Sequence, residues 1–423
     1  MSIILKNATF IHWKSLEQIQ TSLKVEPGSG GGYLLLPADL EGVDISKDEV
    51  IDCTGKLVTK AFAVGHHHVY SALARGMPVP AKQPENFMEI LKYVWWNLDK
   101  ALDKDMIEAS ALATAMACAK AGSAFVIDHH ASPNAIRGSL EIIAKAFHRV
   151  GVGHLLCYEI SDRDGLEKAQ SGLQETEEYL NANQGLVGLH ASFTVGDETL
   201  KKAMNLMEKT NSGIHIHVAE DLADQDHCQQ LYHRRVVERL HQFGVLNSPK
   251  TILAHCLHLS EKERSLIRNS PAWLVENAES NLNNNVGHFR GTDLGKNIML
   301  GTDGMHSDML RSAQAAFFAG QEADQINVPE AYRRFRNVHH YLADNHFKGD
   351  GENNLVVLDY NSPTPVTTDN FPGHFVFGLS SNHIQHVISN GNWLVNNKRL
   401  TNVDEKAILT YTKEQALRMW KKL

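Results

Sequence analysis

The sequence lacks the features of a disulfide-bonded, membrane-spanning or secreted protein. It has no CxxC pair and no signal-peptide core near its first residues. No apolar run reaches the roughly 18 residues that would span a bilayer. The sequence has five cysteines, an odd number that does not suit a disulfide framework. They are Cys53, Cys118, Cys157, Cys228 and Cys256. We therefore expect a cytoplasmic protein in a reducing compartment.

An excess of positive charge is also absent. Lysine and arginine together number 41 against 49 aspartates and glutamates, which gives a net charge of −8. Nucleic-acid binders usually carry a basic face, so this class is excluded. Hydrophobic residues make up 43% of the chain and charged residues 21%, as in ordinary globular proteins, which excludes disorder and collagen-like fibres.

The middle of the chain, residues 59–350, alternates short apolar runs with helical stretches such as 105–121 and 261–268. There are eight of these runs: 62–68, 124–130, 153–160, 186–192, 213–220, 251–259, 273–280 and 297–304. Eight strands separated by helices over about 250 residues predict a (β/α)8 barrel, an α/β fold. An open doubly wound sheet is the alternative, and the lack of a glycine-rich phosphate loop after the first run counts against it.

The two ends of the chain contain short strand-like runs and no domain-sized core of their own. At the N-terminal end the runs are 2–5, 33–36 and 50–52, with a glycine-rich turn at 27–32; at the C-terminal end they are 354–359, 375–377, 386–390 and 392–395. We expect residues 1–58 and 351–423 to form one small discontinuous domain beside the barrel domain of residues 59–350.

Histidine is the unusual component of this sequence, with 24 copies. Most of the eight runs end in His, Asp, Glu or Asn, and the active sites of (β/α)8 barrels assemble at the carboxyl ends of the strands. His66 and His68 are two residues apart, so on a strand both imidazoles face the same side and form half of a transition-metal site. A His-x-His pair alone is equally compatible with chance.

Three further runs end in residues that would complete such a site. His217 and Glu220 form an HxxE pair, which offers one more ligand and a nearby carboxylate that can take and return a proton. His255 ends the sixth run, although a core histidine held by the backbone would give the same pattern. Asp303 lies between glycines at the end of the eighth run, where a carboxylate reaches both metal and water.

These residues, in this order, resemble the amidohydrolase superfamily, and most closely its branch of aminohydrolases, chlorohydrolases and guanine-deaminase-like enzymes. Within that branch the chain is similar to the SsnA-type aminohydrolases. The likeness covers essentially the whole chain and is carried by the stretches 70–76, 128–133, 157–164, 190–194, 277–281 and 301–304. It implies a barrel together with a discontinuous β-sandwich built from both termini.

The resemblance also implies roles for individual residues. One divalent metal, Zn²⁺ in preference to Fe²⁺, would be bound by four ligands: His66, His68, His217 and Asp303. Glu220 would be the proton shuttle, and His255 and Asp303 would orient the attacking water. The substrate-side candidates are His190, His129 (or His130), Trp96 (or Trp95), Arg75 and Asn277, and for all but the first of these ordinary packing is at least as good an explanation.

Three departures from the family pattern affect these expectations. Lys60-Ala61 stands where the family usually has Pro-Gly, and Glu276 stands where it often has His, so that a negative charge could alter substrate preference. His190 ends the fourth run in place of the lysine that bridges two metals in binuclear relatives, which favours a single metal.

The predicted activity is hydrolytic deamination of an aminated N-heterocycle. Hydrolysis of a cyclic amide or of a ring C–Cl bond would use the same metal residues, and a metal-binding scaffold without turnover is a third reading. Such a scaffold would be expected to have lost Glu220, His255 or Asp303, and the chain keeps all three. The expected partner is a small heterocycle, with no nucleic acid and no membrane, and homodimer formation stays open.

Overall fold

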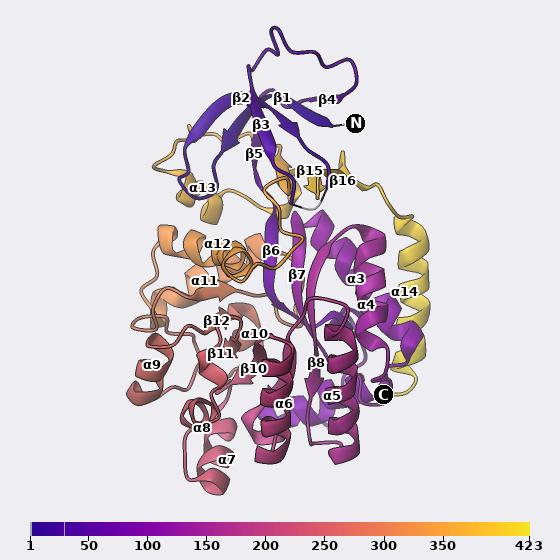
Figure 1. Ribbon diagram of the computed structural model, residues 1–423, viewed down its shortest axis with the longest axis vertical. Helices are drawn as coiled ribbons and strands as arrows, with labels where there is room; N and C mark the ends of the chain where they lie inside the picture. Colours follow the sequence, from indigo (N-terminus) through magenta and orange to yellow (C-terminus); the bar gives the residue numbers. More distant parts are fainter. Residues whose placement is uncertain (1, 29) are drawn as a thin grey trace.

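The computed structural model describes residues 2–28 and 30–423. It contains a parallel sheet of eight strands, and Figure 1 shows this sheet with helices around it. The strands follow one another around the sheet in chain order, and a bridge between His67 and Asp303 joins its first strand to the end of its last. The predicted barrel and all eight of its strands are therefore confirmed. The strands are β6 (Phe62–His67), β7 (Ser123–His130), β8 (Gly153–Ile160), β9 (Val187–Ala191), β10 (Ile214–Val218), β11 (Ile252–His255), β12 (Trp273–Glu276) and β13 (Ile298–Leu300).

Helices surround the barrel because its strands are apolar on both faces and every strand must be covered on the outside. The predicted helices 105–121 and 261–268 are α3 (Lys104–Lys120) and α9 (Glu261–Arg268). The others are α4 (Ser139–Val150), α5 (Leu166–Leu180), α6 (Asp197–Lys209), α7 (Leu222–Tyr232), α8 (Val236–Gln242), α10 (Ala278–Asn283), α11 (Met309–Ala323) and α12 (Val328–Asp344). No described helix is long and apolar enough to cross a bilayer.

Apolar side chains fill the amino-terminal end of the barrel. Phe125, Leu155 and Trp273 belong to one buried cluster there, and Tyr341 of α12 closes it with its ring 5.7 Å from that of Trp273. Gly65 brings β6 close to β13, since a Cβ at this position would lie 2.6 Å from the carbonyl oxygen of Leu300. The polar strand ends are thereby confined to the opposite, carboxyl end of the barrel.

Both termini contribute to a second sheet of nine strands (Figure 1). Its central contact is the antiparallel pairing of β5 with β14, which joins the two ends of the chain. The predicted glycine-rich turn connects β2 to β3, with Ser29 outside the described residues. The strands are β1 (Ile3–Ile11), β2 (Gln18–Val25), β3 (Tyr33–Leu36), β4 (Glu49–Asp52), β5 (Leu57–Lys60), β14 (Leu355–Leu358), β15 (Ile384–Ser389), β16 (Asn392–Asn396) and β17 (Arg399–Leu400).

One predicted strand, 375–377, is wrong, because these residues end the helix α13 (Phe371–Phe377). Phe371 and Phe375 are one helical turn apart and both are buried, whereas Phe377 is exposed, so a helical period governs burial here. The C-terminal helix α14 (Glu405–Trp420) packs against α3 of the barrel rather than on the sheet.

Lys60, one of the departures from the family pattern, has a structural role. Its buried ammonium group donates hydrogen bonds to the carbonyl oxygens of Asp350 and Gly351 at 3.2 and 2.9 Å and lies 3.3 Å from the Asp350 carboxylate. A charged side chain is tolerated in the interior only with such partners. Lys60 thus fixes the start of the barrel to the segment that leaves it.

Candidate active site

Six predicted residues meet at the carboxyl end of the barrel. His66 and His68 lie at the end of β6, His217 is on β10, His255 ends β11, and Asp303 follows β13. All five are buried. The sixth, Glu220, follows β10, and its side chain is 13% exposed. The barrel brings them together from four strands, as the position of active sites in this fold predicts.

The four predicted metal ligands are close enough to share one ion. The Nε2 atoms of His68 and His217 are 3.2 Å apart, and Oδ1 of Asp303 lies 3.1 Å from Nε2 of His68. The same oxygen is 3.6 Å from Nε2 of His66. Donor atoms of the three histidines all lie within 4.8 Å of one another. Imidazole nitrogens with one carboxylate are a usual donor set for Zn²⁺ and Fe²⁺.

Hydrogen bonds on the far side of each ring orient these imidazoles. Nδ1 of His68 donates to the carbonyl oxygen of His129 at 2.6 Å, and Nδ1 of His217 donates to that of His190 at 2.8 Å. A neutral imidazole that donates from Nδ1 presents an unprotonated Nε2, which is the form that binds a metal. The ring of His66 is held by a contact of 2.9 Å between its Nδ1 and Nε2 of His215.

Two ring nitrogens at the centre of this cluster have no hydrogen-bond partner, although both are buried. They are Nε2 of His66 and Nε2 of His255. Buried polar atoms in folded proteins are nearly always paired, so an unpaired one needs an explanation. A cation among His66, His68, His217 and Asp303 would supply the missing partner for His66, so the residues present fit a metal.

Glu220 and His255 lie beside this ligand set and face each other. Nε2 of His255 is 3.6 Å from a carboxylate oxygen of Glu220 and 3.6 Å from Oδ2 of Asp303. Oδ1 of Asn281 accepts a hydrogen bond from Nδ1 of His255 at 2.8 Å, and Nδ2 of Asn284 donates to Glu220 at 3.4 Å. Burial raises the pKa of the Glu220 carboxyl group. A carboxylate so placed is suited to proton transfer.

The backbone at three strand ends is left-handed without glycine. The φ angles are 47° at Ala219, 70° at His255 and 50° at Asp303. Non-glycine residues adopt this region at a cost, and such residues gather at functional sites. Here the turns aim Glu220, His255 and Asp303 at one another.

A cavity opens over these residues, and two other groups of side chains form its walls. One wall is aromatic and apolar and comes mainly from residues 87–96, in α1 (Phe87–Ile90), the π-helix Leu91–Trp95 and the start of α2 (Trp96–Ala101). The other is charged and consists of Asp99, Glu159 and Arg163. His190 and Trp96, two predicted substrate-side residues, line the cavity with ring centroids 6.2 Å apart. Burial lowers the pKa of His190 to about 4.

Three other substrate-side predictions lie outside this cavity. His129 is fully buried behind the predicted ligands, where its Nε2 lies 3.1 and 3.2 Å from the carbonyl oxygens of Leu189 and His215. Arg75 is exposed and lines a separate depression between α3 and α14. Asn277 is buried beneath the strand ends, against Gly301. Tertiary packing, which strand-end position alone does not define, decides these placements.

Glu276 does not face the cavity either. Arg334 donates a hydrogen bond of 2.9 Å to its carboxylate and also binds Asp324. Burial raises the pKa of Glu276 to about 7, and the neighbouring guanidinium opposes that shift. At this position, where the sequence departs from the family pattern, Glu276 thus forms an ion pair with Arg334 and does not line the cavity.

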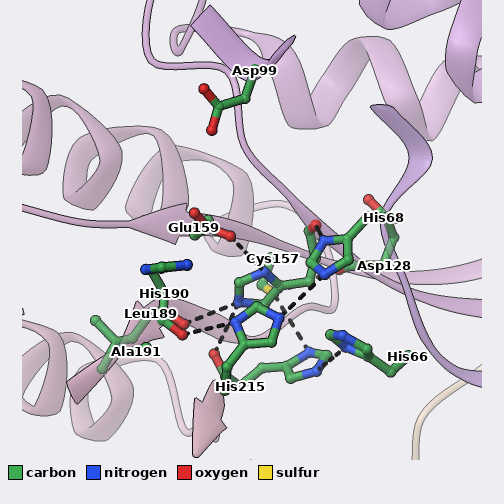
Figure 2. A network of polar contacts seen from close by, with 12 residues as sticks. His66, His68, Asp99, Asp128, Cys157, Glu159, Leu189, His190, Ala191 and His215 are labelled. Atoms are coloured by element: carbon green, nitrogen blue, oxygen red, sulfur yellow. Dashed lines mark hydrogen bonds and ion pairs between the residues drawn. The ribbon is translucent and has the colours of Figure 1, made fainter. Parts of the chain in front are cut away.

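Sequence reasoning missed the charged wall, which Figure 2 shows in part, with Glu159 between Asp99 and the histidines. Arg163 forms an ion pair with Asp99, lies 3.8 Å from Glu159 and stacks over the Trp96 ring at 5.2 Å. Burial raises the pKa of Asp99 to about 7, against the effect of Arg163. Glu159 is the penultimate residue of β8, so the strand-end rule would have found it. Asp99 lies in a helix, which gives no such signal.

Comparisons with known proteins identify a family and related folds. The model of the amidohydrolase family matches residues 61–350. The 5'-deoxyadenosine deaminase of Methanococcus maripaludis is 25% identical over 405 residues, 89% of this chain and 92% of that protein. A zinc-bound adenosine deaminase from Xanthomonas campestris superposes with a TM-score of 0.84 at 15% identity, covering 99% and 98% of the two chains. The zinc-complexed atrazine chlorohydrolase of Arthrobacter aurescens gives 0.81 at 16% identity, covering 98% and 100%.

Proposed function

The chain belongs to the amidohydrolase family, and on that premise we propose that it is a metal-dependent aminohydrolase that replaces an exocyclic amino group of an N-heterocycle by a carbonyl oxygen and releases ammonia. Hydrolysis of a C–N bond is the activity named for its deaminase relatives. The proposal assigns this chemistry to the six residues that meet at the carboxyl end of the barrel.

We infer that His66, His68, His217 and Asp303 hold one divalent ion and that this ion is Zn²⁺. When bound, such an ion supplies a Lewis acid that brings the pKa of a water molecule to about 7. The structural neighbours named above hold zinc, and the donor set suits it. Metal analysis of protein from cells supplied with both zinc and iron would decide between the two ions.

The chain's own residues then account for the proton transfers. Glu220 takes a proton from the attacking water on a carboxylate oxygen and delivers it to the leaving nitrogen. Nε2 of His255, held in place through Asn281, contacts the water or the polarised ring, and Oδ2 of Asp303 orients the water from the other side. His190 and Trp96 contact the heterocycle from the cavity wall.

The single observation that carries this proposal is the geometry around His255. Its unpaired, buried Nε2 lies 3.6 Å from both Glu220 and Asp303, while its Nδ1 is fixed by Asn281. A histidine with only a structural role would have a hydrogen-bond partner for this nitrogen among the surrounding residues. Here the nitrogen faces the open cavity between two carboxylates, where a reacting water and carbon would lie.

The test is ammonia release by the zinc-loaded protein over a panel of aminated purines, pyrimidines and their nucleosides. Cyclic amides and chlorinated triazines complete the panel, with mass spectrometry of each product. The proposal expects ammonia and a carbonyl product from at least one aminated member. Ring opening or chloride release alone would replace deamination by one of the two related hydrolyses.

A further inference from the structure

The three histidines proposed as metal ligands differ in the group that lies against Nδ1. Nδ1 of His68 and Nδ1 of His217 each donate to a backbone carbonyl oxygen, at 2.6 and 2.8 Å. A carbonyl oxygen can only accept a hydrogen bond, so in these neutral rings the proton stays on Nδ1. Nδ1 of His66 instead lies 2.9 Å from Nε2 of His215. An imidazole nitrogen can donate or accept, so this contact alone does not fix the tautomer of His66.

A further contact leads from His215 to a carbonyl oxygen (Figure 2). Nδ1 of His215 lies 3.6 Å from Sγ of Cys157, and the thiol donates to the carbonyl oxygen of Asp128 at 3.5 Å. Both side chains are fully buried, and burial raises the pKa of the Cys157 thiol well above its usual range, so the thiol keeps its proton. Its single hydrogen goes to Asp128, and the sulfur therefore accepts a hydrogen bond from Nδ1 of His215.

The carbonyl oxygen of Asp128 thereby sets the direction of all three hydrogen bonds. Since Nδ1 of His215 donates to Cys157, Nε2 of the same neutral ring is unprotonated and accepts from Nδ1 of His66. Nε2 of His66 is then unprotonated too. It is the buried nitrogen without a hydrogen-bond partner, 3.6 Å from Oδ1 of Asp303. An imidazole in this form is ready to bind a cation.

We infer that His215 and Cys157 are positioning residues that hold His66 in its metal-binding tautomer. This inference rests on the proposed function, because it assumes a metal at Nε2 of His66. Without the thiol, a proton on Nδ1 of His215 would be buried and unpaired, which is costly. The alternative tautomers place a proton on Nε2 of His215 and one on Nε2 of His66, where it opposes a cation.

The surroundings of Cys157 also allow a purely structural role. The residue belongs to the apolar cluster that fills the barrel, together with Phe125 and Leu155. Gly188 on β9 leaves room for its sulfur, since a Cβ at this position would lie 3.0 Å from Sγ. If Cys157 only fills space, a small apolar residue should replace it. If it accepts the hydrogen bond from His215, a hydroxyl group should replace the thiol and a methyl group should not.

The affinity for Zn²⁺ separates these roles. The zinc-loaded chain is titrated with a chelator of known affinity at one pH near neutrality. The Kd of Cys157→Ala is compared with that of Cys157→Ser, because the two variants differ by one hydroxyl group. Hydrogen-bond partners of metal ligands contribute about 10- to 100-fold to metal affinity. Since Cys157 acts through His215, we expect zinc binding about tenfold weaker in Cys157→Ala, and within about threefold of the parent in Cys157→Ser.

Two sets of variants complete the experiment. Cys53→Ala is the matched control, because Cys53 is also a fully buried free thiol but lies in the apolar cluster of the terminal sheet. Its Kd for zinc should equal that of the parent. His215→Leu and His215→Gln repeat the comparison one step nearer the metal, since glutamine keeps an acceptor and a donor and leucine keeps neither. Leucine should weaken zinc binding by up to about 100-fold, and glutamine should restore much of it.

The outcomes separate the inference from the function it rests on. Parental zinc affinity in Cys157→Ala, or an equal loss in Cys157→Ala and Cys157→Ser, overturns the positioning role. If Cys157→Ala fails to fold, the two His215 variants decide by the same criterion, and if His215→Leu fails to fold as well, these residues serve stability and the inference is overturned. The expected loss of zinc affinity, with no ammonia released by the parent from any panel member, supports the inference and overturns the proposed reaction. A parent that binds no zinc overturns both.

Discussion

Replacement of Glu220 by glutamine separates proton transfer from metal binding. Glutamine has nearly the same shape, and its amide oxygen can still accept the hydrogen bond from Nδ2 of Asn284, which is 3.4 Å from the carboxylate. Since Glu220 is not one of the proposed ligands, the variant should fold and bind about one metal ion per chain. It cannot, however, accept a proton and return it.

The expected fall in kcat follows from the number of proton-transfer steps that depend on this carboxylate. A general acid–base group contributes about 10²–10⁴-fold to the rate, which is roughly 3–5 kcal/mol of activation free energy. Glu220 would serve both the deprotonation of water and the protonation of the leaving nitrogen, so kcat should fall toward the upper end of that range. KM should change little, because Trp96 and His190 remain in place.

The assay compares Glu220→Gln with Asp303→Asn in metal content and in ammonia-release kinetics on one substrate. Asp303→Asn should lose metal as well as rate, because Oδ1 of Asp303 is 3.1 Å from Nε2 of His68 in the proposed ligand set. If Glu220→Gln holds its metal and stays within tenfold of the parent kcat, Glu220 is not the proton shuttle, and His255 becomes the next candidate.

Three further predictions follow from the same structure. The purified protein should hold about one equivalent of metal and His217→Ala should lose most of it, as mass spectrometry would show; two equivalents would contradict the single site. Deletion of residues 351–423 should give an aggregating protein in size-exclusion chromatography, because β5 would lose its partner β14 and expose an edge; a soluble, active truncation would speak against a shared sheet. Arg75→Ala should leave kcat/KM within about twofold, since Arg75 lies outside the cavity, and a tenfold fall would place it at the substrate.

The barrel could be predicted because two signals coincide in the sequence. Each apolar run is long enough for one strand, and most of the runs end in a residue such as His217 or Asp303 that has little reason to follow a core strand. For the strands near the two ends of the chain, the local residue composition is the only signal in the sequence. For that reason the sequence predicts a strand at 375–377, whereas Phe371 and Phe375 pack one helical turn apart and the segment is α13.

The residues that we propose for metal binding and proton transfer could be chosen from the sequence, but the walls of the cavity could not. The positions of His66 and His68 follow from strand geometry, since alternate residues share a face. Asp99 and Trp96 come from a helical insertion between β6 and α3, and where such a segment folds over the barrel is decided by tertiary packing. For the same reason Asn277 and His129, which stand at strand ends, are buried outside the cavity.

The most direct test of the central claim is metal-dependent ammonia release. The protein is stripped with a chelator, assayed over the aminated panel, and assayed again after one equivalent of Zn²⁺ per chain. The account predicts that ammonia release disappears with the metal and returns at one equivalent, with the carbonyl product formed in equal amount. Ammonia release that is unaffected by chelation, or none from any aminated heterocycle with the metal restored, would contradict it.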